Sequence, residues 1–262
     1  MVQYFLKSVC LCLLTLGCLS CDNSVIEMPV PNRVPGYCLT FDDHYITQWG
    51  SIKSLLDSNN VHATFFITNP SELSIEEIKI LDELQKSGNE IGCHSLRHLN
   101  AIEYLKNHSV QEYIDAEIMP ALKIFSNYGI YPTSFAFPQG LTADSLNAVM
   151  LTHFKILRTV AEQQRYGFVD KVDTIESIFY KFAGERVIAG LGIDKNFNIS
   201  IEQIRGAFNR TMNKNEIVIF YAHCPVEKVT AAYQTEKNYL RELIKAAKSL
   251  GLKSYKLSDL AN

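Results

Sequence analysis

The six residues CLTFDD at positions 38–43 form an apolar, strand-like run that ends in two carboxylates. Six further strand-like runs follow along the chain, and segments with helical periodicity separate them. This alternation predicts an α/β domain with a parallel sheet, whose ligand site lies at the carboxyl ends of the strands. Seven strands are one fewer than a regular eight-stranded barrel has, so an open sheet and an incomplete barrel both fit the pattern.

Helix caps and the change of periodicity set the expected boundaries. Ser74 with Glu77, and Ser200 with Gln203, form capping boxes, which begin helices. The expected strands are 37–41, 63–68, 90–94, 134–137, 154–160, 187–193 and 217–221, and the expected helices are 46–58, 74–87, 110–128, 143–151, 201–212 and 231–250.

The composition indicates a globular domain without a basic excess. Hydrophobic residues make up 47% of the 262 residues and charged residues 20%, which is enough to bury a core. The net charge of −3 disfavours nucleic acid as a partner. Four of the seven cysteines crowd the first 21 residues, and the other three, Cys38, Cys93 and Cys224, make no disulfide framework.

Residues 1–21 have the layout of a secretory signal. Lys7 is their only charge, an apolar run covers 9–16, and small residues precede Cys21. The segment is too short for a convincing membrane span. Its end resembles the lipobox of a bacterial lipoprotein, so we expect lipid on Cys21, with Cys18 as the alternative site and release without lipid as a further alternative.

The rest of the chain divides into two parts. Residues 22–35 read as a polar, proline-containing tether, and 36–262 as a single folded domain. We expect this domain to act outside the cytoplasm, in the cell envelope, and to reach the membrane through the N-terminal lipid.

Asp42 and Asp43 leave the end of the first strand side by side. Neighbouring side chains on a strand point to different sides, so one carboxylate can bind a cation while the other takes a proton. The alternative is a turn or a helix cap at the strand exit, where Asp is common.

Two histidines follow the third strand at a spacing of four. On a helical turn, His94 and His98 would present their imidazoles on one face, and a divalent cation can bridge that spacing. With one aspartate they make the ligand set of a catalytic zinc site that keeps a position open for water. A thiolate site at Cys93 or Cys224 is the alternative, although alternation turns each cysteine away from its neighbouring histidine.

His223 follows the last strand and is therefore expected at the same edge of the sheet. An imidazole at this position suits an acid or a base, and a structural role is the alternative.

Together these residues resemble the polysaccharide deacetylase family, also called the NodB homology group or carbohydrate esterase family 4. Four segments match its motifs in order: TFDD at 40–43, HSLRH at 94–98, FAFPQG at 135–140, and His223. The resemblance covers roughly residues 36–225 and implies a distorted (β/α)7 barrel.

The resemblance also implies a role for each residue. Asp43, His94 and His98 would hold a divalent metal, expected to be Zn²⁺. Metal-activated water would attack the acetyl group of a glycan, and acetate and a free amino sugar would leave. The remaining roles are a general base at Asp42, a protonated acid at His223, and an oxyanion-binding backbone N–H near Gln139.

The chain departs from the family's motifs at several positions. His44 stands where glycine is common, Gln139 replaces a tyrosine, and Tyr221 replaces a leucine that lines the acetyl pocket. The fourth motif, an Asp-containing segment with a tryptophan, has no clear match.

The departure that bears most on catalysis is Ala136, which replaces the arginine that holds the catalytic aspartate. Arg158, on the neighbouring strand, is the candidate substitute, and a salt bridge at the barrel rim is its alternative role.

These observations predict a metal-dependent deacetylase acting on an acetylated carbohydrate. Another C–N bond hydrolase built on the same metal site is one alternative, because fold does not determine substrate. A glycan-binding lipoprotein with decayed catalysis is the other. The presence of Asp42 and His223 beside all three ligands favours an active enzyme.

Overall fold

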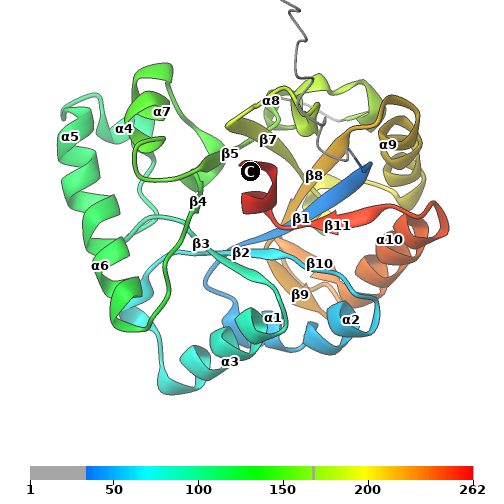
Figure 1. The fold of residues 1–262 in the computed structure, drawn as a ribbon, viewed down its shortest axis with the longest axis horizontal. Coiled ribbons are helices and arrows are strands. Elements are labelled where there is room, and N and C mark those ends of the chain that lie inside the picture. The colour runs from blue at the N-terminus through cyan, green and yellow to red at the C-terminus, as the bar shows by residue number, and fades with distance from the viewer. Residues whose placement is uncertain (1–33, 167–168, 262) are drawn as a thin grey trace, which may run out of the picture. The chain divides into compact units, whose positions relative to one another are not determined.

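The computed structural model of the protein describes residues 34–166 and 169–261. Among them, seven parallel strands pair side by side, and the last pairs with the first (Figure 1). Six residue pairs, from Gly36 with Ile217 to Phe41 with Ala222, close this ring. The expected (β/α)7 barrel is therefore confirmed, and the open sheet is excluded. The barrel strands, in spatial order, are β1 (Gly36–Asp43), β2 (Thr64–Ile67), β3 (Glu90–Cys93), β4 (Ser134–Ala136), β5 (Ile156–Val160), β7 (Val187–Gly192) and β8 (Ile217–Ala222).

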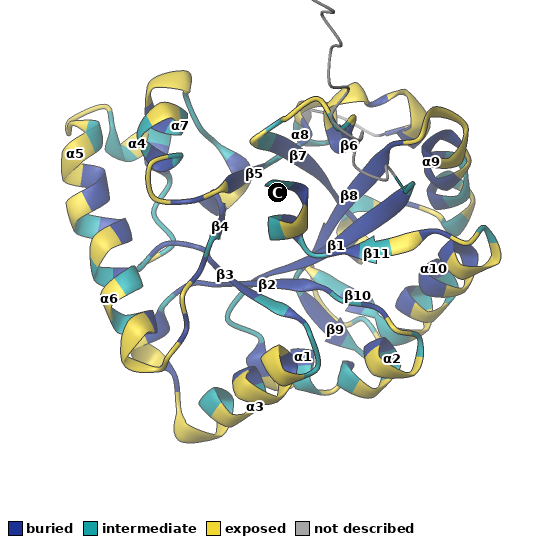
Figure 2. Ribbon diagram, viewed as in Figure 1, coloured by how far each residue is buried: buried dark blue, intermediate teal, exposed yellow. Residues whose placement is uncertain are grey.

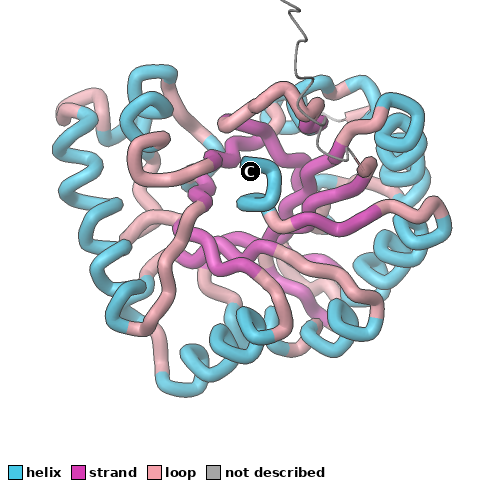
Figure 3. Tube along the Cα trace, in the orientation of Figure 1, coloured by secondary structure: helices cyan, strands magenta, loops and turns pink. Residues whose placement is uncertain are grey.

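Helices surround the ring of strands (Figure 3). Both predicted capping boxes form, and a third, at Ser109, begins α5. A π-helical turn, η2 (Ile114–Ile118), joins α5 to α6. The α-helices are α1 (Ile46–Gly50), α2 (Lys53–Ser58), α3 (Ile75–Lys86), α4 (Ala101–Tyr104), α5 (Val110–Tyr113), α6 (Met119–Asn127), α7 (Asp144–Met150), α8 (Glu162–Tyr166), α9 (Ile201–Lys214) and α10 (Lys237–Ser249).

Some expected boundaries are wrong. The helix predicted at 46–58 is divided between α1 and α2. The helix predicted from 231 begins only at Lys237, because Gln234–Glu236 forms strand β10 and pairs with β9 (Cys224–Val226). The two-residue strand β6 (Phe179–Tyr180) pairs antiparallel with β8 and was not predicted, since so short a run carries no periodicity.

Strand alternation divides the core into two layers. Along β8, Ile217 and Ile219 point into the barrel, while Val218 and Phe220 pack outward against the helices. Nearly all strand residues are buried, and the helices expose only their outer faces (Figure 2). Tyr221 is the next inward-facing residue of β8 after Ile219. It lies at the carboxyl end of the strand, where the sequence predicts the ligand site.

The last segment closes the opposite end of the barrel. Strand β11 (Lys253–Tyr255) pairs with the start of β1, and the 3-10 turn η7 (Leu257–Ala261) follows it. Leu257 and Leu260 are buried in the inner core cluster, and Ser258 N donates to Glu90 Oε2 at 3.0 Å. Figure 1 shows this end of the chain within the ring of strands. Ligands therefore reach the barrel from the carboxyl ends of the strands.

The predicted leader, with Cys18 and Cys21, and most of the predicted tether lie outside the described residues. Within the described part of the chain, no helix is long and apolar enough to cross a bilayer.

Candidate functional site

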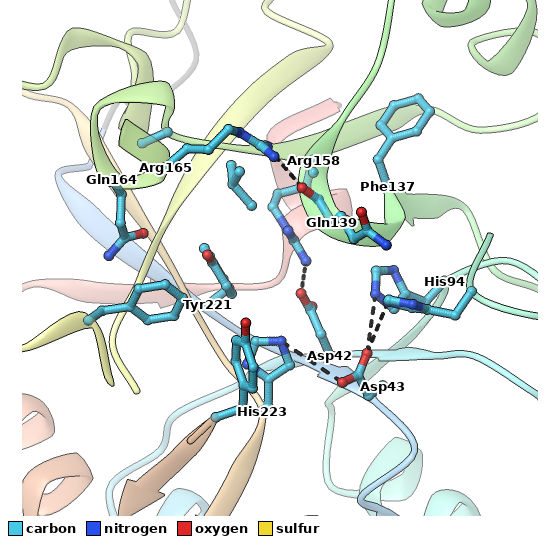
Figure 4. Close-up of a pocket in the computed structure, with 16 residues that line it drawn as sticks. Asp42, Asp43, His94, Phe137, Gln139, Arg158, Gln164, Arg165, Tyr221 and His223 are labelled. Carbon is cyan, nitrogen blue, oxygen red and sulfur yellow. Dashed lines mark hydrogen bonds and ion pairs between the residues drawn. The ribbon is translucent and has the colours of Figure 1, made fainter. Parts of the chain in front are cut away.

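A cavity of about 450 Å³ opens at the carboxyl ends of the strands. The residues predicted as acid, base, metal ligands and pocket all line it. Figure 4 shows their side chains converging from several strands. They are Asp42, Asp43, His94, His98, Gln139, Arg158, Tyr221 and His223.

Both aspartates face this cavity, although alternation would separate them. Asp42 belongs to the inward face of β1, as the pattern requires. Asp43 has φ 83°, a left-handed backbone that is uncommon outside glycine, and this breaks the alternation at the strand end. The two carboxylates therefore share one cavity while they contact different partners.

Asp43 lies among three imidazoles. Its Oδ1 is 3.3 Å from Nε2 of His98 and 3.6 Å from Nε2 of His94, and its Oδ2 is 4.0 Å from Nε2 of His223. Burial raises the pKa of Asp43, but the nearby histidines outweigh burial and lower it to about 2. The carboxylate is therefore ionised throughout the neutral range.

Asp43, His94 and His98 fit a divalent cation. Their donor atoms all lie within 4.8 Å of one another. Asp43 Oδ1 is buried and has no hydrogen-bond partner, so it faces the two Nε2 atoms without bonding to either. Carboxylate and imidazole donors are typical of zinc, and a set of three leaves a coordination position free.

His94 is held in the tautomer that a metal ligand needs. Its Nδ1 donates to the backbone O of Ala136 at 2.7 Å, which leaves the lone pair of Nε2 directed toward Asp43 and His98. Burial lowers the pKa of His98, and the nearby His94 lowers it further. The lowered pKa favours the neutral form of His98, which is the form that binds a metal.

The backbone between these histidines is not the predicted helical turn. Ser95 has φ 67° and His98 has φ 58°, and both values lie in the left-handed region. The rings still approach, with centroids 4.9 Å apart. An irregular loop, rather than helical spacing, thus brings the imidazoles together.

Arg158 contacts Asp42. Its Nη2 donates to Asp42 Oδ2, and both side chains are almost fully buried. Arg158 is the direct neighbour of Ala136 in the pairing of β4 with β5, so its guanidinium comes from the strand next to the one that carries the family's arginine. The ring of Tyr221 lies 4.9 Å from the guanidinium carbon. Asp42 Oδ1 has no hydrogen-bond partner and is free to accept a proton.

His223 is fixed by Asp194, which the sequence analysis missed. Asp194 is fully buried just after β7, and its Oδ2 accepts from Nδ1 of His223 at 2.6 Å. Its Oδ1 accepts from the backbone N of His223 and from Thr235 Oγ1. The indole N–H of Trp49 donates to the backbone O of His223 at 2.9 Å.

The surroundings of His223 favour its charged form. Burial lowers the pKa of His223, but the bond to Asp194 and the charges of Asp194, Asp42 and Asp43 outweigh burial and raise it. The available signal for Asp194 was its position: it directly follows an apolar run that ends at Ile193.

Gln139 occupies a strained turn at the cavity wall. It has φ 57°, its backbone O accepts from Arg165 Nη2 at 2.8 Å, and its Oε1 accepts from Asn100 Nδ2 at 2.8 Å. Figure 4 shows Arg165 reaching Gln139 along one side of the cavity. The turn is therefore held at both its backbone and its side chain.

The alternative thiolate site does not form. Cys93 and Cys224 are buried and free, and neither belongs to the candidate metal cluster. Burial raises the pKa of Cys93 to about 12, so its thiol stays protonated.

Comparisons with known proteins give a family match and a shared fold. The family model described as Polysaccharide deacetylase matches residues 31–153. No curated protein matches the chain.

Three solved structures are similar to this chain. Peptidoglycan deacetylase PdaC from Bacillus subtilis is 20% identical with a TM-score of 0.50, over 87% of this chain and 90% of that one. A family 4 carbohydrate esterase from Streptomyces lividans, solved in complex with acetate, is 16% identical with a TM-score of 0.50, over 84% and 92%. BA3943, a CE4 family pseudoenzyme from Bacillus anthracis, is 16% identical with a TM-score of 0.52, over 88% and 66%. At these identities the likeness shows a shared fold.

Proposed function

We propose that this chain, whose residues 31–153 match the family model described as Polysaccharide deacetylase, is a metal-dependent hydrolase that removes N-acetyl groups from a carbohydrate. The observation that carries the proposal is the convergence of two carboxylates and three imidazoles on one cavity. Asp43, His94 and His98 would hold the metal, which we take to be Zn²⁺. When bound, such a cation supplies Lewis-acid polarisation of the acetyl carbonyl and makes water a stronger nucleophile.

Asp42 is the general base. Its Oδ1 lacks a partner and accepts the proton of the attacking water, while Arg158 holds Oδ2 and so fixes the direction of Oδ1. The backbone N–H near Gln139 stabilises negative charge that develops on the acetyl oxygen. Tyr221 lines the acyl pocket beside this group.

His223 is the general acid. Asp194 accepts from Nδ1, and in the charged imidazolium, which the raised pKa of His223 favours, Nε2 carries the second proton and faces the cavity. Transfer of that proton to the leaving nitrogen releases the free amine, and acetate is the second product. The raised pKa of His223 keeps the acid protonated at a pH where Asp43 is already ionised.

The substrate in this proposal is an acetylated glycan of the cell envelope. PdaC, which has this fold, is a peptidoglycan deacetylase. Lipid at Cys21 would hold the domain at the membrane close to such a glycan. Replacing Cys21 with Ser should release the domain from the membrane fraction, and unchanged membrane retention would contradict the anchor.

The first test measures bound metal and released acetate together. The wild-type chain should bind one equivalent of zinc and release acetate from N-acetylated oligosaccharides. Asp42→Asn should keep the metal and lose about 10²- to 10⁴-fold in kcat, because it removes only the base. His94→Ala and His98→Ala should lose the metal as well.

The same measurements separate the alternatives. Acetate from O-acetylated sugars alone would make the protein an esterase, and ammonia or another amine from a small molecule would make it a different C–N hydrolase. Metal binding without turnover on any acetylated sugar would favour a binding protein, since BA3943 shows that a pseudoenzyme can share this fold.

A further inference from the structure

The loop that joins the two histidine ligands, residues 95–97, has a strained backbone conformation. Ser95 and His98 both have left-handed φ values, which residues other than glycine rarely adopt. Within the loop, the backbone N of His98 donates to Ser95 Oγ at 3.0 Å. Strained backbone of this kind persists where its surroundings determine it, so the contacts from outside the loop decide where the imidazoles point.

Those contacts come largely from Glu117, in the π-helical turn η2. Its backbone O accepts from Leu96 N at 3.1 Å, its Oε2 from Arg97 N at 2.9 Å and its Oε1 from Arg97 Nε at 2.6 Å. The Glu117 side chain is fully buried. A buried carboxylate is unfavourable unless each oxygen is bonded, and here the loop bonds both.

The two contacts with Arg97 differ in their surroundings. The Arg97 side chain is 55% exposed, so solvent screens its charge and weakens its pull on Glu117. The backbone N–H of Arg97 lies inside the loop, directly before His98, and its bond to Oε2 fixes the loop itself. Residues that orient metal ligands without touching the metal commonly change its affinity.

We propose that Glu117 is a positioning residue of the metal site, which sets the relative placement of His94 and His98 by accepting the backbone N–H groups of the loop between them. The inference rests on the proposed function, because it takes Asp43, His94 and His98 as metal ligands. It adds a residue from the outer layer of helices, 19 positions beyond His98 in the chain, that contributes no ligand atom.

The test compares the Zn²⁺ affinity of four metal-free proteins by competition with a chelator. Glu117→Gln should bind Zn²⁺ about 10- to 100-fold more weakly than the wild type. Arg97→Met should lower stability, because it leaves the buried Oε1 without its side-chain partner, but the Zn²⁺ affinity of the folded protein should stay within about threefold, because the backbone N–H of residue 97 still bonds Oε2. Glu216→Gln is the matched control: Glu216 is also a buried carboxylate bonded to an arginine, Arg210, but it lies away from the site. It should lower stability and leave the affinity of the folded protein unchanged.

Two further measurements keep the result clear. The absorption spectrum of bound Co²⁺ should change in Glu117→Gln and not in Glu216→Gln, because only the first alters the ligand geometry. If Glu117→Gln does not fold, Glu117→Asp keeps the charge, withdraws the carboxylate by one methylene, and should weaken Zn²⁺ binding in the same direction.

The results that would contradict this inference distinguish the positioning role of Glu117 from the metal site itself. Wild-type affinity in the folded Glu117 variant, or an equal loss in Glu216→Gln, would overturn the positioning role and leave the metal site intact. A wild-type chain that binds no Zn²⁺ would overturn the metal site itself, and this inference with it.

Discussion

At the scale of single residues, the contact between an arginine and the general base Asp42 is present although the arginine comes from a different position in the sequence. Ala136 and Arg158 are paired neighbours on adjacent strands, and both strands direct side chains toward the same cavity wall. A guanidinium from either position can reach Asp42, whose carboxylate is buried and requires a cation. The motif departure at Ala136 therefore changes the source of the arginine and not its contact.

Moving the arginine back tests this equivalence. Arg158→Met should lower the free energy of unfolding by about 3–5 kcal/mol, because it leaves the Asp42 carboxylate buried and unpaired. Adding Ala136→Arg should recover part of both stability and acetate release. Urea denaturation and an acetate assay measure the two effects. A double variant no better than Arg158→Met would mean that the two positions are not equivalent.

Asp194 sets the pH range of the acid. Its carboxylate raises the pKa of His223 against the effect of burial. Asp194→Asn removes that effect and leaves burial, so the pKa of His223 should fall. The alkaline limb of the kcat profile should then move to lower pH, with kcat reduced about 10²-fold or more. An unmoved alkaline limb would mean that another group is the acid.

The same pKa shift predicts how stability depends on pH. The pKa of His223 is higher in the folded than in the unfolded chain, so protonation stabilises the fold. This contribution is complete below the unfolded pKa and is lost as pH rises through the folded pKa. Asp194→Asn should flatten this part of the curve of unfolding free energy against pH, and an unchanged curve would contradict the coupling.

At the scale of elements, the sequence predicted the barrel strands and the edge where the site lies. It did so because buried parallel strands are continuous apolar runs and capping boxes are local signals. It missed Asp194 because the expected tryptophan does not accompany that aspartate. It missed Glu117 because an acidic residue in a helical segment usually faces solvent, and only the fold shows that this one is buried. The loop geometry at Ser95 and His98 depends on that distant contact, so no local pattern contains it.

One turn at the cavity wall leaves no room for a side chain. Gly140 has φ 66°, and a Cβ there would lie 2.4 Å from Cγ1 and 2.7 Å from the backbone N of Val160. Gly140→Ala should displace the turn that carries Gln139 and lower kcat, with a loss of stability of about 1–3 kcal/mol. Gly206→Ala, in α9, is the control. A Cβ at this position meets nothing within 4 Å, and the change should raise the free energy of unfolding by about 0.5–1 kcal/mol. Equal activity in both variants would show that this turn has no part in turnover.

At the scale of the whole molecule, the two ends of the barrel have separate tasks. The carboxyl ends carry the site, and η7 seals the other end with Leu257 and Leu260. Leu257→Ala should therefore lower the free energy of unfolding by about 2–5 kcal/mol and leave Zn²⁺ affinity and kcat of the folded protein unchanged. Urea denaturation beside a zinc titration measures both. A parallel loss of metal affinity would show that the sealed end is coupled to the site.

The pairing of β1 with β8 also has a consequence for how the protein is made. Residues 36–41 find their partners at 217–222, so nearly the whole domain must leave the ribosome before the ring can close. Until then one edge of β1 has unpaired backbone groups beside apolar side chains, and such edges attract other chains. Nascent chains arrested before residue 217 should therefore depend on chaperones for solubility, and they lack a working centre because Asp42 and His223 have not yet met.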